Sequence, residues 1–139
     1  MPVITRDVFL PHPVQTVWAA LTDPDQLAIW LMPNDFQPVL GHRFTFRTDP
    51  APGFDGIVHC EVLELIPTTR LVFSWMAGKV DTRVTFALAE EAAGTRLRLR
   101  HEGFGLTQLP VRMLLSVGWK RILRTRLPAH LDTRQASTV

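Results

Sequence analysis

The feature that most constrains the fold is an alternation of apolar and polar residues that recurs between positions 43 and 102. Short runs with a period of two, separated by turns, are typical of half-buried strands. Short connections between such runs make neighbouring strands antiparallel. Together with an apolar run at the N-terminus, this pattern predicts an antiparallel sheet of six or seven strands with one face in water. The arginine row at positions 96, 98 and 100 marks the expected wet face.

Positions 8–30 read VFLPHPVQTVWAALTDPDQLAIW and predict a strand that leads into two short helices. We expect Asp23 to cap the second helix, with Pro24 in its first turn and Gln26 reaching back in a capping box. The first helix has an apolar face with the spacing of one helical side, made by Val14, Val17, Trp18 and Leu21.

Positions 110–128 have the pattern of one long helix, with Pro110 in its first turn and Pro128 at its end. The following residues are polar, and we expect them to fray. The predicted order is β-α-α-β(5–6)-α in one α+β domain, 1–131, followed by a tail, 132–139. The helix side expected to cover the sheet consists of Val111, Leu114, Leu115, Gly118, Trp119 and Ile122.

The composition is that of an ordinary globular protein, with 46% hydrophobic and 20% charged residues and a net charge of +2. The single cysteine, Cys60, excludes an intrachain disulfide, and we expect it to be buried and inert. No apolar run approaches the ~20 residues that span a bilayer. We therefore expect a cytoplasmic protein without a transmembrane segment. The basic residues within 111–131 are interpreted as a solvated helix face, so we expect no nucleic-acid partner.

Motifs of several enzyme classes are missing from the sequence. It has no glycine-rich phosphate loop, no HExxH, no paired-cysteine motif and no nucleophile elbow. The spacing of the histidines is not that of metal ligands. We therefore expect no catalytic residue, no metal and no cofactor, and we lean against an enzyme.

His101 is the best polar candidate for a binding site, because its parity places it with Leu97 and Leu99 on the covered side of the last strand. A neutral imidazole there can orient a ligand or act as a base near pH 7. The alternative is a core histidine satisfied by a backbone carbonyl or by water. The other residues expected around a ligand, or else in a plain packed core, are Trp30, Phe46, Phe73, Trp75, Phe104, Met113 and Trp119.

Gly118 bears on the choice between cavity and packed core. A glycine in mid-helix costs about 1 kcal/mol relative to alanine, and Gly118 lies on the side expected to face the sheet. Either the helix backbone packs close to the sheet, or room is left for a ligand, and we include Gly118 among the expected ligand-binding residues. We expect the cavity to open between this helix and residues 30–36, where Pro33 breaks an apolar stretch suited to a lid.

An ordered set of short motifs resembles the START-like (SRPBCC) superfamily, in particular the group related to activators of the heat-shock-protein-90 ATPase. The resemblance covers roughly residues 3–127, and it implies the helix-grip fold, a curved sheet around a long C-terminal helix. The residues that carry it are Pro13, Val17, Trp18, Ala20 to Pro24, Leu27, Trp30, Gly41 to Phe44, Gly56, Pro67, Arg70 to Trp75, Val84 to Phe86, Gly94 to Leu97 and His101 to Phe104.

The resemblance leaves several functions open. It implies a cavity between sheet and helix that binds a small apolar or lipid-like ligand, which is the leading hypothesis. One alternative is a protein that contacts a chaperone in the stress response, as the activators do. Another is a cyclase or dehydratase acting on polyketide-like substrates. A homodimer is compatible with each of them.

Overall fold

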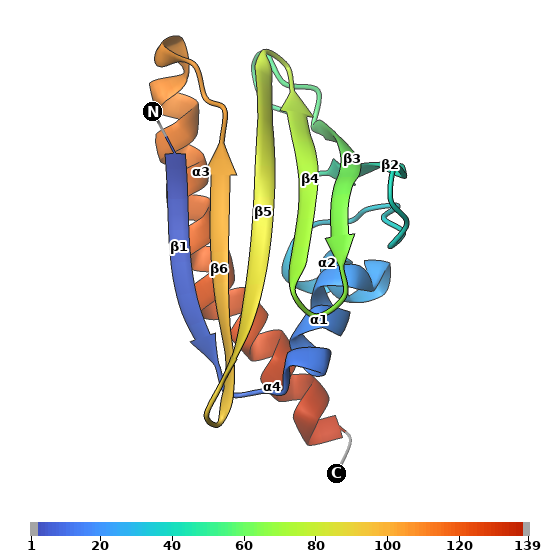
Figure 1. Cartoon of the computed structure of the whole chain (residues 1–139). Coiled ribbons are helices and arrows are strands. Elements are labelled where there is room, and N and C mark those ends of the chain that lie inside the picture. Colours follow the sequence, from blue (N-terminus) through green and yellow to red (C-terminus); the bar gives the residue numbers. More distant parts are fainter. Residues whose placement is uncertain (1–2, 138–139) are drawn as a thin grey trace.

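The computed structural model describes residues 3–137 and has the predicted order of elements. One antiparallel sheet of six strands is covered on one face by a long C-terminal helix, which crosses behind the sheet in Figure 1. The elements are β1 (Val3–Leu10), α1 (Val14–Thr22), α2 (Pro24–Trp30), β2 (Arg43–Arg47), β3 (Ile57–Ile66), β4 (Arg70–Ala77), β5 (Val80–Glu91), β6 (Gly94–Glu102), η1 (Leu106–Gln108), α3 (Leu109–Arg121), η2 (Ile122–Arg126) and α4 (Leu127–Ser137).

The strand order is β1-β6-β5-β4-β3-β2, so β1 and β2 form opposite edges of the sheet. The two short helices α1 and α2 carry the chain from one edge to the other (Figure 1). The later strands pair in sequence order, as their alternation predicts; short turns join the successive strands from β3 to β6, and the longer loop 48–56 joins β2 to β3. These features confirm the helix-grip arrangement.

The outer face of the sheet carries the arginine row of β6. Arg96 and Arg98 both bond the Asp7 carboxylate on β1, at 2.9 and 3.1 Å. Arg100 pairs with Glu102 at 3.2 Å. The opposite face is apolar, and its aromatic rings pack against one another in T-shaped or tilted pairs across β2, β4 and β5. The prediction of one wet and one covered face is therefore confirmed.

The two short helices form where the sequence predicts them, with one difference at the cap. The Asp23 carboxylate accepts the N–H of Asp25 at 3.0 Å, as an N-cap should. Gln26, however, donates its side-chain N–H to the Asp23 carboxylate at 3.1 Å. Its carbonyl oxygen, which a capping box needs as the acceptor of the Asp23 N–H, lies 2.9 Å from His130 Nε2 on α4, and the Asp23 N–H bonds the Ala19 carbonyl instead. The expected capping box is thus replaced by a contact with the C-terminal helix.

The long helix does not end at Pro128, so that prediction is wrong. A proline inside a helix lacks an N–H and clashes with the carbonyl four residues earlier. Here the preceding turn, η2, is π-helical, and the Leu127 N–H bonds the carbonyl of Ile122, five residues back. This wider turn lets the helix pass Pro128 and continue through α4 to Ser137.

Within residues 3–137, no helix has the length and apolar character needed to cross a membrane.

Candidate functional site

A cavity of about 900 Å³ lies between the inner face of the sheet and α3. Its volume is within the range of small-molecule sites, and its lining is mostly apolar, as in such sites. Among the residues that the structure describes, the lining consists of Leu31, Met32, Thr48, Ala51 to Phe54, Val58, Trp75, Ala77 to Val80, Thr107, Gln108, Val111, Leu114, Leu115, Gly118, Trp119, Ile122 and Arg126.

The helix side predicted to cover the sheet forms one wall of this cavity. Trp119 is buried, whereas Leu114 is 72% exposed and Leu115 and Ile122 are only partly buried. A Cβ added to Gly118 would meet nothing within 4 Å. Of the two explanations for a mid-helix glycine, the structure therefore supports open space beside the helix rather than close packing against the sheet.

The mouth of the cavity is only partly where the sequence places it. Leu31 and Met32 contribute, but the rest of the rim comes from the loop 48–54 and the turn 77–80. The rest of the segment expected to form a lid is instead hydrogen-bonded to β2. Asn34 forms a bridge to Phe46, and the Asp35 carboxylate accepts the N–H of Thr45 at 2.6 Å. That backbone hydrogen bond lowers the pKa of Asp35. Residues 33–36 thus extend the edge of the sheet.

His101 is fully buried behind the cavity wall, on the side of the sheet predicted for it. The indole N–H of Trp119 donates to its Nδ1 at 3.1 Å. Its Nε2 lies 2.7 Å from the hydroxyl of Thr82, which in turn donates to the carbonyl of Trp75 at 2.9 Å. Because Nδ1 accepts, the neutral ring carries its proton on Nε2 and donates to Thr82. Both ring nitrogens are therefore occupied within the core.

Burial lowers the pKa of His101 to about 4, so the ring is neutral at physiological pH. A neutral ring accepts from Trp119 and donates to Thr82 at the same time, whereas in an imidazolium the N–H on Nδ1 would face the indole N–H of Trp119, donor against donor. The histidine therefore fixes two tryptophans: Trp119 through its indole N–H and Trp75 through Thr82, with ring centroids 5.8 Å apart. Both tryptophans form the cavity wall.

The other expected site residues fall into three places. Trp75, Gly118 and Trp119 line the cavity. Met113 is 59% exposed on the outward side of α3. Behind the lining, in the core, lie Trp30, Phe46, Phe73, His101 and Phe104. A ligand role for each of these residues stays a prediction.

Several lining residues were not predicted from the sequence. Phe54 lies between two strands, in a position without periodic pattern, and Lys79 lies in a tight turn. Arg126 belongs to the basic residues interpreted as a solvated helix face, but it lies within the π-helical turn η2, where α-helical spacing no longer gives the direction of a side chain. Hydrophobic periodicity carries no information about side chains in loops. These lining residues are recognised only because the fold brings the loop 48–54 and the turn 77–80 to the rim of the same cavity.

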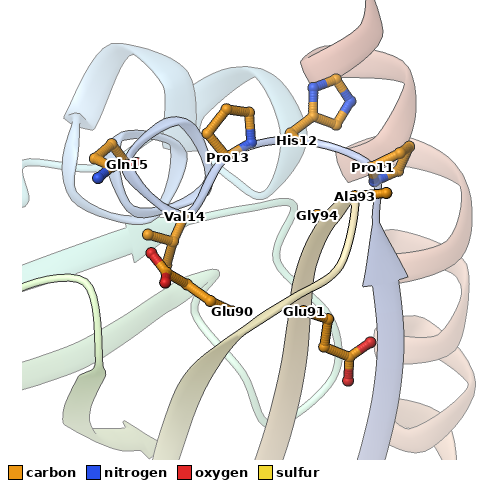
Figure 2. A pocket seen from close by; sticks show the side chains of 9 residues that line it. All are labelled: Pro11, His12, Pro13, Val14, Gln15, Glu90, Glu91, Ala93 and Gly94. Carbon is orange, nitrogen blue, oxygen red and sulfur yellow. The ribbon is translucent and has the colours of Figure 1, made fainter.

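Two smaller hollows contain polar groups that are already engaged. Figure 2 shows the first, of about 300 Å³, between the loop around His12 and the β5–β6 turn; the His12 ring is directed toward α4 and away from Glu90 and Glu91. There it lies 2.9 Å from the carboxylate of Asp132. The second, of about 400 Å³, lies over β2–β4, where the Ser74 hydroxyl accepts the N–H of Glu61 at 2.9 Å.

Cys60 is buried, as expected, and burial raises the pKa of its thiol. Such a thiol is a weak nucleophile. Within residues 3–137, no group of three or more His, Cys, Asp or Glu side chains is arranged to hold a metal ion. The described lining of the large cavity offers an apolar body together with hydroxyl, amide and cationic donors.

Comparisons with known proteins agree with this architecture. A crystal structure of a Mesorhizobium loti protein is 32% identical, with a TM-score of 0.87, and the match covers 94% of this chain and 97% of that one. A protein from the dynemicin biosynthetic locus is 26% identical, with a TM-score of 0.78, over 96% of this chain and 48% of that one.

The Aha1 dimer of Colwellia psychrerythraea shares the fold at 22% identity, with a TM-score of 0.74, over 88% of this chain and 91% of that one. No curated protein sequence matches the chain. The family described as activator of Hsp90 ATPase homolog 1-like protein matches residues 11–132, nearly the whole chain. The chain therefore belongs to the activator of Hsp90 ATPase homolog 1-like family, within the START-like superfamily.

Proposed function

We propose that the protein binds a small apolar or lipid-like molecule in the cavity between the sheet and α3. The observation that carries this proposal is the cavity itself, which has a volume of about 900 Å³ and a mostly apolar lining. Empty apolar space of this size forfeits the contacts that a packed core would make. A ligand restores those contacts, and Gly118 keeps the space open for it.

Filling the cavity from within tests this proposal. Gly118→Leu places a side chain in the open space, whereas Val117→Leu enlarges a side chain that is 67% exposed on the same helix. We expect saturable binding of Nile red to the wild-type protein and to Val117→Leu, and its loss in Gly118→Leu. Circular dichroism should show that both variants stay folded. Equal binding by all three proteins would place the dye outside this cavity.

A second candidate is a protein-contact role for the outward side of α3. Met113 and Val117 are 59% and 67% exposed there, and Leu106 in the preceding η1 is 91% exposed, so large apolar side chains gather on this surface. The contact would be with a second copy, as in the Colwellia Aha1 dimer, or with a chaperone, as the family description suggests. Light scattering of the wild type and of Met113→Ser/Val117→Ser tests self-association, and a monomer at all concentrations would exclude the first of these partners.

A further inference from the structure

The charged side chains that line the cavity are both cations. Its described lining includes two cations, Lys79 and Arg126, and no aspartate or glutamate. Neither cation has a carboxylate partner within residues 3–137. The carboxylates that pair with arginines do so on the sheet, namely Asp7, Glu61, Glu64, Glu91 and Glu102.

Arg126 is held in place at one end of the cavity. Its guanidinium donates to the carbonyls of Ile29 at 3.2 Å and Leu31 at 3.4 Å, at the C-terminal end of α2. A guanidinium has five N–H donors in a rigid fork, so these two contacts orient it and leave donors for a further acceptor. Lys79 lies in the β4–β5 turn, beside the first residues of α3, where Gln108 bonds its backbone carbonyl at 2.8 Å. The two cations therefore lie near opposite ends of the stretch of α3 and η2 that lines the cavity.

We infer that the ligand is an amphipathic anion, with its apolar body against Trp75 and Trp119 and its carboxylate or phosphate head at Arg126. This inference rests on the proposed function and specifies its ligand. The fixed planar fork of Arg126 matches a two-oxygen acceptor, and such charge-assisted pairs are about twice as strong as neutral hydrogen bonds. Lys79 is a flexible point charge on an exposed turn and adds long-range attraction rather than orientation.

The test compares probes that share a ten-carbon chain and differ in the head: decanoate, decyl phosphate, decanol and decyltrimethylammonium. A change in tryptophan fluorescence, to which Trp75 and Trp119 in the cavity wall contribute, reports occupation of the cavity, and calorimetry gives the affinity. We expect both anions to bind about tenfold or more tighter than decanol, from the usual strength of hydrogen bonds to charged groups, and the cation to bind most weakly. Whether decanoate or decyl phosphate binds tighter identifies the head.

Variants separate recognition of the head from a merely structural role of Arg126. Arg126→Gln should bind decanol as the wild type does and lose the preference for the anions. Arg124→Gln, which changes an exposed arginine of the same turn that does not line the cavity, should keep that preference. Lys79→Gln should reduce the preference by a smaller factor, with a weaker dependence on salt.

Three outcomes would overturn the inference. Equal affinity for decanoate, decyl phosphate and decanol would show that the head is not recognised. An anion preference that survives in Arg126→Gln would place the head elsewhere, and loss of decanol binding in that variant would show that Arg126 only supports α2. If calorimetry detects no binding of any of the four probes to the wild type, the proposed function itself fails.

Discussion

At the scale of single residues, the central group is His101, which connects two strands to the long helix. It accepts from Trp119 on α3 and lies 2.7 Å from Thr82 on β5, so one imidazole positions both the helix and the cavity wall. Each bond is buried, and a buried donor left without an acceptor costs about 1–3 kcal/mol. The sequence predicts the inward direction of His101, but not its partners.

The buried histidine predicts a dependence of stability on pH. Because the pKa of His101 in the folded protein is about 4, below its ordinary value of 6.5, the unfolded chain takes up the proton first as the pH falls. Stability is therefore fully present above about pH 6.5 and declines toward pH 4, by about 3 kcal/mol in total. Urea denaturation of the wild type across this range measures the decline.

His101→Phe isolates this contribution. It should be less stable than the wild type at pH 7, because the Trp119 indole N–H loses its acceptor, and its stability should change less between pH 6.5 and 4. A residual slope is expected from His130, whose pKa is also lowered by burial. A slope as steep as that of the wild type would show that His101 does not carry the effect.

At the scale of elements, the long helix combines two local irregularities that serve different ends. Gly118 lacks a side chain where α3 borders the cavity, and the π-helical turn η2 redirects the chain before Pro128. After that turn, Leu127 and Leu131 are fully buried. The glycine lowers the stability of the helix and leaves space beside it for the cavity. The π-helical turn allows the helix to continue through Pro128 with its apolar residues still packed in the core.

Gly118→Ala should therefore stabilise the protein by about 1 kcal/mol, since alanine is the better helix former and its Cβ meets no atom within 4 Å. Thermal unfolding measures the gain. Gly56→Ala is the matched contrast, because Gly56 has a φ of +84° and an added Cβ would clash with the Thr48 carbonyl. A loss of stability in Gly118→Ala would show that the helix packs closer to the sheet than the structure indicates.

At the scale of the whole molecule, segments from the first thirty residues contact the C-terminal helix. The loop between β1 and α1 and the helix α2 both contact α4, through His12 with Asp132 and Gln26 with His130, each at 2.9 Å. Thr95 on β6 donates to the His12 carbonyl at 2.8 Å and joins the sheet to this region. The C-terminal turns thus close one end of the core.

Leu131→Ala should destabilise the whole domain by about 2–5 kcal/mol, the usual cost of truncating a buried leucine, because Leu131 is fully buried. Chemical denaturation followed by fluorescence should show one cooperative transition at lower urea. Thr133→Ala, an exposed change one half-turn further along α4, should shift it little. If both variants match the wild type, α4 contributes no stability to the core.

Most of the architecture could be predicted from local patterns. The period-two runs between positions 43 and 102 became β2 to β6, and the apolar face around Val17 and Leu21 became the buried side of α1. These predictions hold because alternation and helical spacing act over a few residues, and each element must bury its apolar side. The inward parity of His101 has the same origin.

Other features were decided only by the tertiary structure. Local rules predict that Pro128 ends the helix. In the fold, a π-helical turn lets the helix continue, and the burial of Leu127 and Leu131 offsets the free energy that this irregular turn costs. Trp18, expected on the buried face of α1, is only half-buried. Phe54, Lys79 and Arg126 meet around one cavity although they are far apart in the chain. Local sequence determines which side of an element is apolar, but the space left between two such sides depends on how all elements pack together.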